Sequence, residues 1–319
     1  MNQSFHSRTK HTAAGPHLAL VAVQIIFGTW PIVGKIALRT LPSTGLVAFR
    51  VAGAAAAFLL LLRLKGKLTT PRRGDIARLA VYSLLGVVLN QFLFLKGLEL
   101  STVVNATIIG TAIPVFTLLV GALLGFEKLS ARAAVGTAIA AAGVVYLVDP
   151  LRADFSGGKA LGNLLLVGNS FVYGAYIAVS KDVFRRYGAL TAMTWVFAFG
   201  CIATVPVGGY HLSQVPVQNL GWVTWLSVAY IILVPTVGAY YLNAWALERV
   251  APSTVAVYIY LQPLIAFALA PLVLGADEQW GPRTWVAAAL IFAGVAVVTL
   301  RSRSRVMQEV SEHPDALGH

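Results

Sequence analysis

Long apolar runs separated by short polar segments dominate the chain. A helix needs roughly 20 apolar residues to cross the hydrocarbon core of a bilayer, so the runs predict membrane-spanning helices. None shows the alternating pattern of a membrane β-strand, and a helix satisfies its own backbone hydrogen bonds in lipid. We therefore predict an all-α integral membrane protein with ten transmembrane helices. The runs occupy residues 17–38, 46–63, 77–98, 103–125, 131–148, 160–182, 191–210, 221–247, 253–275 and 283–301.

The composition supports a membrane protein and excludes other classes. Of the 319 residues, 58% are hydrophobic and 11% are charged, whereas soluble domains have about 45–50% and about 25%. Too few polar groups exist to coat a water-soluble globule, and so apolar a chain is not disordered. Cys201 is the single cysteine, which excludes a disulfide scaffold.

The basic residues predict the orientation of the helices. The net charge is +12, and with the N-terminus inside, most Lys and Arg fall in inside loops and tails, as the positive-inside rule requires. We expect a multi-pass protein of a plasma membrane, such as a bacterial inner membrane, with cytoplasmic tails at residues 1–16 and 302–319. The positive charge therefore indicates orientation, and we expect no nucleic-acid partner.

Residues of the first five runs recur in the second five. Matching charged residues and prolines in one order are rare by chance, so we predict two repeats, residues 17–150 and 151–301. Five helices are an odd number, so the second repeat enters the membrane from the opposite side. Inverted repeats are typical of transporters that bind substrate near the midplane; the alternative is a duplication that serves only stability. The recurring pairs include Lys35 and Lys181, Glu99 and Glu248, Pro114 and Pro263, and Glu127 and Glu278.

The recurring segments resemble those of a known family. A Gly-to-Lys segment opens each repeat, Arg50 lies early in the second run, and Leu-Gly motifs follow Pro114 and Pro263. Residues 17–301 thus resemble the EamA-like branch of the drug/metabolite transporter superfamily, although the seventh run lacks a counterpart of Arg50. The resemblance implies ten helices, cytoplasmic termini and transport of small metabolites, often outward, with aromatic amino-acid exporters as one branch.

Polar and aromatic residues inside the runs are candidates for a substrate cavity, because polar groups within a membrane are costly and usually functional. Helical spacing places Asn169, Tyr173 and Tyr176 on one face. Aromatic faces with amide groups suit a small zwitterion or an aromatic or cationic ring. The alternative is interhelical packing, with Asn and Gln joining helices. The candidates are Gln24, Trp30, Asn90, Gln91, Asn169, Tyr173, Tyr176, Tyr241, Trp245, Tyr258 and Gln262.

Charged residues and prolines form a second set of candidates. Lys35 and Arg50 could attract carboxylates at the outer mouth, or extend to the interface as ordinary snorkelling side chains. Glu99 and Glu248 could belong to outer and inner closing contacts, or be solvated helix-end charges. Prolines interrupt helices and can open a cavity wall. The predicted helix breaks are Pro31, Pro114, Pro235 and Pro263.

These features favour a secondary transporter over an enzyme. All 12 acidic residues and all six histidines lie in loops, tails or helix ends, so we expect gradient-driven uniport or exchange without a proton relay. The sequence has no P-loop, zinc-binding or hydrolase motif, so no cofactor or metal is expected. The leading hypothesis is export of an amino acid or related metabolite by a monomer. Alternatives are uptake of a carboxylate or nucleotide-sugar-like anion, and a non-transport membrane scaffold.

Overall fold

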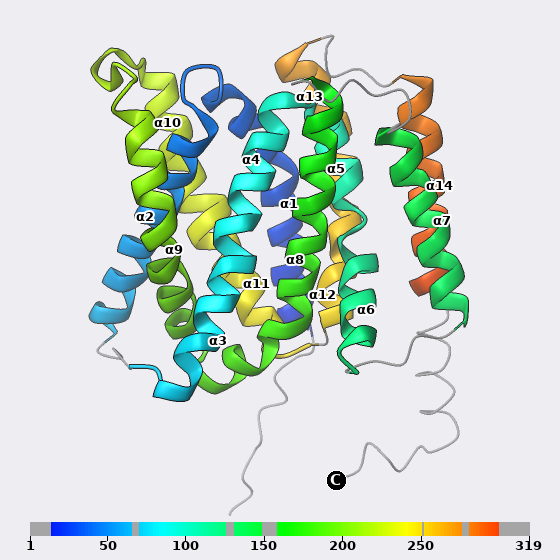
Figure 1. Cartoon of the computed structure of the whole chain (residues 1–319), viewed down its shortest axis with the longest axis horizontal. Coiled ribbons are helices and arrows are strands. Elements are labelled where there is room, and N and C mark those ends of the chain that lie inside the picture. Colours follow the sequence, from blue (N-terminus) through cyan, green and yellow to red (C-terminus); the bar gives the residue numbers. More distant parts are fainter. Residues whose placement is uncertain are drawn as a thin grey trace, which may run out of the picture.

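The computed structural model describes residues 14–65, 70–125, 131–148, 158–250, 252–275 and 281–299, and in these ranges it contains helices and no strands (Figure 1). The all-α prediction is therefore confirmed for the described part. The elements of the first half are α1 (Ala14–Ala37), α2 (Ser43–Leu64), α3 (Arg73–Ser83), η1 (Leu84–Leu89), α4 (Asn90–Leu100), α5 (Val103–Gly110), α6 (Ile113–Leu123) and α7 (Ala131–Val148).

The second half has a similar order of helices. Its long helices begin and end within a few residues of the apolar runs, as do those of the first half. The elements are α8 (Lys159–Tyr187), α9 (Ala189–Leu212), η2 (Val217–Asn219), α10 (Trp222–Ile231), η3 (Ile232–Gly238), α11 (Ala239–Leu247), α12 (Pro252–Val257), η4 (Tyr258–Leu261), α13 (Gln262–Leu274) and α14 (Pro282–Thr299).

Seven described helical stretches are long and apolar enough to cross a membrane. They contain α1, α2, α3 with α4, α5 with α6, α8, α9, and α10 with α11. The stretches Ala134–Leu147 in α7 and Gln262–Leu274 in α13 are apolar but shorter. Large apolar side chains such as Leu60, Ile202 and Leu272 lie exposed on the outside of the bundle, where lipid would cover them.

Several of the long stretches are interrupted near their middle. The π-helices η1 and η3 separate α3 from α4 and α10 from α11, and Pro235 lies inside η3. Pro114 and Pro263 lie in the first turns of α6 and α13, next to the breaks that precede these helices. Helix α1 continues through Pro31. The irregular backbone is thus placed where the polar side chains described below converge.

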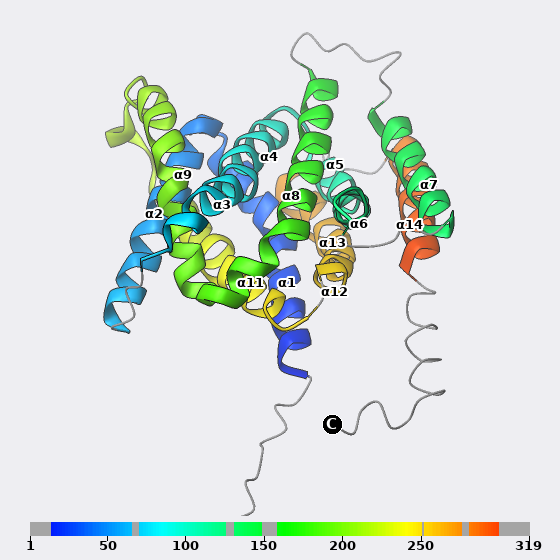
Figure 2. The ribbon, with the colours of Figure 1, turned by 60° about the horizontal axis from the view of Figure 1, so that its bottom comes forward.

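Two helix pairs join the halves at close range. Helix α2 packs against α9, and α7 packs against α14, at opposite sides of the bundle (Figures 1 and 2). Glycine permits the first approach, because a Cβ atom on Gly208 of α9 would lie 2.4 Å from the Ala48 Cβ and 2.5 Å from the Thr44 carbonyl oxygen. A Cβ on Gly294 of α14 would lie 2.4 Å from the Gly136 carbonyl oxygen on α7. Small residues at such positions let helix backbones approach closely in a membrane.

Two further helices lie inside the bundle. Helix α1 packs against α11 and α13, and α8 packs against α4 and α6. Each of these helices therefore contacts segments far away in the sequence. We call the end where α3 begins and α8 ends the α3/α8 end, and the opposite end, where α1 ends and α10 begins, the α1/α10 end. Helix α1 begins and α14 ends at the α3/α8 end (Figure 2).

Candidate functional site

The π-helix η3 creates a polar position inside α10–α11. Pro235 has no backbone N–H, so the Ile231 carbonyl lacks the partner that an ordinary residue four positions later would supply. The π-turn pairs each carbonyl with the backbone nitrogen five positions later, and the Thr236 hydroxyl also donates to the Ile231 oxygen, over 2.5 Å. The side chain of Thr236 is fully buried and so stands fixed within the bundle. Proline and threonine together therefore present a hydroxyl oxygen to the helix opposite.

Arg50 of α2 uses that oxygen. Its side chain is 1% exposed, its Nε donates to the Thr236 Oγ1 over 3.0 Å, and its Nη1 donates to the Gln91 Oε1. The guanidinium carbon lies 4.0 Å from the centre of the Trp30 ring, a cation–π contact. Arg50 is seven residues into α2, or about 10 Å from its start. It thus lies within the bundle and not at its mouth.

Amide and phenol groups extend this network. The Gln91 Nε2 donates to the Tyr240 hydroxyl over 2.7 Å, and that hydroxyl donates to the Asn90 Oδ1 over 3.1 Å. The Asn169 Nδ2 donates to the Asn90 carbonyl oxygen over 2.9 Å, which satisfies backbone beside the π-helix η1. The Arg50 cluster is defined by Trp30, Arg50, Asn90, Gln91, Thr236 and Tyr240.

A small cavity adjoins this cluster. About 20 Å³ within it is open to the centre of a water-sized sphere, room for about one water molecule. The Gln262 Nε2 donates to the Gln24 Oε1 over 2.6 Å at its wall, and the Asn243 Nδ2 lies 3.4 Å from the Tyr173 hydroxyl. The cavity is lined by Gln24, Phe27, Ile113, Tyr173, Ile177, Asn243, Val255, Ile259 and Gln262.

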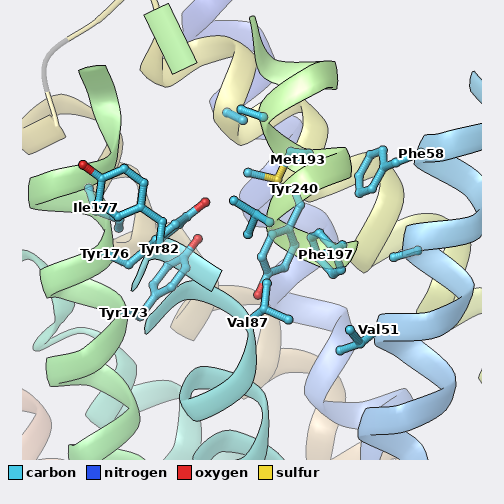
Figure 3. Packing of buried hydrophobic residues seen from close by; sticks show 14 of the residues in the cluster. Val51, Phe58, Tyr82, Val87, Tyr173, Tyr176, Ile177, Met193, Phe197 and Tyr240 are labelled. Atoms are coloured by element: carbon cyan, nitrogen blue, oxygen red, sulfur yellow. The ribbon is translucent and has the colours of Figure 1, made fainter. Parts of the chain in front are cut away.

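The cavity and the Arg50 cluster are neighbours, joined by a ring contact between one residue of each. The rings of Phe27 and Tyr240 meet edge to face, with centroids 6.0 Å apart. Tyr240 and Asn243 lie three residues apart on α11 and therefore on one face. Figure 3 shows Tyr173 and Tyr176 of α8 lying close together, with Tyr240 beside Phe197. The Tyr173 and Tyr176 rings stack at 5.8 Å.

The remaining cavity candidates lie elsewhere. The Tyr258 hydroxyl is 2.7 Å from the Nδ1 of His17, near the start of α1. Trp245 lies under the guanidinium of Arg249 at 4.1 Å, and Tyr241 is half-buried against the main core cluster. None of these three lines the cavity. The structure therefore brings together Gln24, Tyr173 and Gln262 at the cavity and Trp30, Asn90 and Gln91 at Arg50.

The two lysines of the repeated segments lie at helix ends. The Lys35 Nζ donates to the Leu98 carbonyl oxygen over 2.7 Å and also to that of Ser101, where α4 ends. The Lys181 Nζ donates to the Val250 carbonyl oxygen over 2.8 Å, just after α11. Terminal carbonyls of a helix have no partner within it, and a cation there also meets the negative end of the helix dipole. Each lysine thus joins the first and third helices of its half.

The two candidate glutamates occupy opposite ends of the bundle. Glu99 pairs with Lys96 on the same helix at 3.1 Å. Glu248 accepts a hydrogen bond from the Ala189 backbone nitrogen at the start of α9 and pairs with Arg249 at 2.8 Å. Glu248 therefore joins α11 to α9, whereas the ion pair of Glu99 stays within α4.

A charged contact that the sequence analysis missed joins α3 to α8. The buried carboxylate of Asp75 accepts from the Arg186 Nη1 at 2.8 Å and from the Tyr187 hydroxyl at 2.6 Å. Asp182 and Arg78 form a more exposed ion pair beside it at 3.1 Å. The available signals in the sequence were an acid just before the run 77–98 and arginines just after the run 160–182.

The α1/α10 end has an uncharged contact in the corresponding place. There the hydroxyls of Thr40, just after α1, and Thr224 of α10 lie 2.9 Å apart. The helices that close the two ends are therefore held by different chemistry. The contact between α3 and α8 is charged, whereas the contact between α1 and α10 is a pair of hydroxyls.

Replacing Thr236 by valine tests the cluster. The buried Arg50 Nε would lose its acceptor and the Ile231 carbonyl would lose one of its donors, so we expect a loss of about 1–3 kcal/mol in stability, seen as a lower unfolding midpoint in detergent. Thr204→Val is the matched control, because the Thr204 hydroxyl only donates to the Gly200 carbonyl of its own helix, and it should cost little. Equal midpoints for both variants would contradict the assigned role.

The sequence analysis also left Thr236, Tyr240 and Asn243 outside its candidate set. Tyr240 and Asn243 are polar residues of the same apolar run, 221–247, as the candidates Tyr241 and Trp245. The feature of the sequence that distinguishes Thr236 is the proline directly before it, Pro235. Among the described residues, no group of three His, Cys, Asp or Glu side chains could hold a metal ion.

Together, the fold and the site define a multi-pass α-helical membrane protein with polar groups gathered in its interior. The chain belongs to the EamA-like transporter family of the drug/metabolite transporter superfamily, because the family model matches residues 15–148 and again residues 160–300. Members of this family are named as transporters and not as enzymes.

Curated relatives match nearly the whole chain. An uncharacterized transporter of Archaeoglobus fulgidus is 27% identical over 89% of this chain and 97% of its own. The uncharacterized inner membrane transporter YedA of Escherichia coli is 26% identical over 88% and 90%. The protein WALLS ARE THIN 1 of Arabidopsis thaliana is 24% identical over 88% and 82%. One solved crystal structure, 20% identical, has a TM-score of 0.64 and covers 91% of this chain and 99% of that one, which supports the fold alone.

Proposed function

We propose that this chain carries an amino acid or a related small polar metabolite out of the cell by alternating access between two inverted five-helix repeats. In this proposal all ten apolar runs cross a plasma membrane, such as a bacterial inner membrane, with both termini cytoplasmic. Transport is gradient-driven uniport or exchange by a monomer. The α3/α8 end then faces the cytoplasm.

One observation carries the proposal, namely that both repeats contribute amide groups to a single cavity. Gln24 comes from α1 and Gln262 from α13, and their side chains meet at the cavity wall. Gln24 lies ten residues into α1, or about 15 Å, half of a core roughly 30 Å thick. Substrate sites of transporters with inverted repeats lie near the midplane between the repeats.

Reciprocal helix contacts support the inverted repeat. Gly143 of α7 and Gly294 of α14 are equivalent in the two repeats, and each meets the other's helix. A Cβ on Gly143 would lie 2.8 Å from the Ile291 side chain, and one on Gly294 would meet Gly136 and Ala140. Contacts that are reciprocal between equivalent positions are the signature of a twofold relation. Two matches of one family model along the chain are consistent with it.

Counterflow in proteoliposomes tests transport directly. With a panel of amino acids and related metabolites, we expect accelerated exchange of at least one class of compound. Gln262→Ala removes the amide that meets Gln24 and should lower the rate about 5- to 30-fold, the effect of about 1–2 kcal/mol. Trp30→Ala removes the ring beneath Arg50 and should also slow exchange.

The control variant lies outside the cavity. Trp285 on α14 is 60% exposed on the surface of the bundle, and Trp285→Ala should leave the exchange rate close to that of the unmodified protein. No exchange of any compound by folded, reconstituted protein would contradict the proposed function. Unchanged rates in Gln262→Ala and Trp30→Ala would remove the two residues from the site.

A further inference from the structure

We propose that Arg50 is the receptor for a carboxylate of the substrate, so that the transported molecules are small carboxylates with an apolar body. The inference rests on the proposed function and specifies its substrate class. Its evidence is a buried positive charge held entirely by neutral groups, next to the cavity.

The guanidinium of Arg50 is a buried positive charge. A guanidinium stays protonated in a protein, and an unpaired charge inside a protein or membrane is costly. At 1% exposure, Arg50 is among the largest fully buried side chains of the described structure. A ligand of opposite charge would offset that cost.

The groups that hold the Arg50 side chain are neutral. The hydrogen-bond and ring partners of Arg50 within the described residues are the Gln91 Oε1, the Thr236 Oγ1 and the face of Trp30, and all three are uncharged. Asn90 and Tyr240, the next members of the cluster, carry no charge in their ordinary states either. The protein therefore positions the guanidinium but supplies no counter-ion from this part of the chain.

The acidic residues of the described structure pair with other basic side chains. Asp75 and Asp182 lie at the α3/α8 end with arginine partners. Glu248 pairs with Arg249 after the end of α11, and Glu99 pairs with Lys96 near the end of α4. Each of these carboxylates is thus engaged at a helix end, away from the middle of the bundle where Arg50 lies.

The guanidinium of Arg50 has more N–H donors than the described residues use. Arginine has five N–H donors in a planar fork that matches a carboxylate. Neutral acceptors hold the Nε and the Nη1, while no described residue accepts from the Nη2. Thr236 and Gln91 therefore fix the plane of the fork and leave donor capacity for a ligand oxygen.

Tyr240 connects Arg50 to the cavity. Tyr240 belongs to the Arg50 cluster, and its ring meets that of Phe27 in the cavity wall. Six of the nine cavity residues are Phe27, Tyr173 or aliphatic side chains, which suit an apolar body. A ligand whose apolar part occupies this cavity could place a carboxylate toward Arg50, once the helices separate enough to admit it.

Four probes with one carbon skeleton test the charge requirement. They are 3-phenylpropionate, phenylalanine, 3-phenylpropionamide and 3-phenylpropylamine, which are an anion, a zwitterion, a neutral amide and a cation. Binding is measured as the rise in unfolding midpoint of the purified full chain in detergent. We expect both carboxylates to stabilise the protein, with affinities at least about tenfold above those of the amide and the amine.

Gln91→Glu is the decisive variant. It places a carboxylate on the atom that already accepts from Arg50, so the guanidinium gains an internal counter-ion and keeps its position. The variant should fold at least as stably as the unmodified chain and lose the preference for carboxylates. Arg50→Gln should lose the same preference, and Gln91→Glu keeps the test valid if Arg50→Gln fails to fold. Lys35→Gln removes a basic group at a helix end and should leave the ranking of the probes unchanged.

The outcomes separate this inference from the proposed function. Equal stabilisation by amide or amine, no stabilisation by either carboxylate, or an unchanged preference in Gln91→Glu would overturn the role of Arg50. Counterflow of a neutral or cationic compound in the same preparation would then leave the proposed transport intact. Carboxylate binding that depends on Arg50, without counterflow of any compound, would support the receptor and contradict transport.

Discussion

Gly208→Leu is expected to prevent stable folding, whereas Gly209→Leu, one position further along α9, is expected to be tolerated. A Cβ atom on Gly208 would lie 2.4 Å from the Ala48 Cβ and 2.5 Å from the Thr44 carbonyl oxygen. The second of these atoms belongs to the backbone of α2 and cannot rotate away. The two helices would have to separate along much of their contact, at a cost of about 3 kcal/mol or more.

The neighbouring glycine provides a matched control. A Cβ on Gly209 would meet nothing within 4 Å, so leucine there would extend into the surroundings of the bundle. Leucine also favours the helix by roughly 1 kcal/mol over glycine. The measurements are the yield of monodisperse protein in detergent and its unfolding midpoint. If the two variants behaved alike, the close contact between α2 and α9 would be wrong.

Asp75→Asn is expected to open the α3/α8 end of the bundle. The change keeps the shape of the side chain but removes the charge that Arg186 and Tyr187 bind. Under the proposed alternating access, loss of this contact should raise the population in which α3 and α8 separate by about tenfold. The Asp182–Arg78 pair has side chains 45% and 54% exposed, and an exposed pair contributes little. Asp182→Asn should therefore change that population less than about threefold.

Thiol labelling can measure this opening. Cys201 is the single cysteine, so a Cys201→Ser background carries no other thiol. Ser180 is fully buried on α8, one helical turn before Phe184, and Ser180→Cys introduces a thiol that reacts with maleimide only when this end opens. Equal labelling rates in Asp75→Asn and Asp182→Asn would contradict the role assigned to Asp75.

The apolar runs predicted the helices well because the bilayer imposes one simple requirement on the sequence. Run 131–148, for example, coincides with α7. The polar sites were harder to predict because helical spacing identifies a face but not the direction in which it points. Tyr241 and Trp245 share one face of α11 and Tyr240 and Asn243 share another, and the second pair lies at the site. Both faces carry an aromatic ring and both look amphipathic in sequence.

Thr236 illustrates what a sequence pattern does not contain. Its role depends on the Ile231 carbonyl next to Pro235 and on Arg50, which lies 186 residues earlier in the chain. The first relation is local and could have been inferred from the Pro-Thr pair. The second arises only when α2 and η3 pack together. Candidates such as Arg50, Gln24 and Gln262 were identifiable because each is a strongly polar residue in an apolar run.

The π-helices η1 and η3 also set the rotational phase of the helices that follow them. Each residue of an α-helix turns the chain by about 100°, and a π-turn accommodates one residue more than an α-turn. Asn90 and Gln91 follow η1 directly, and Tyr240 and Asn243 follow η3. Deleting a single residue from either π segment would restore regular winding and rotate these polar side chains toward the lipid. The inward direction of the site is thus encoded by an extra residue upstream as well as by the polar residues themselves.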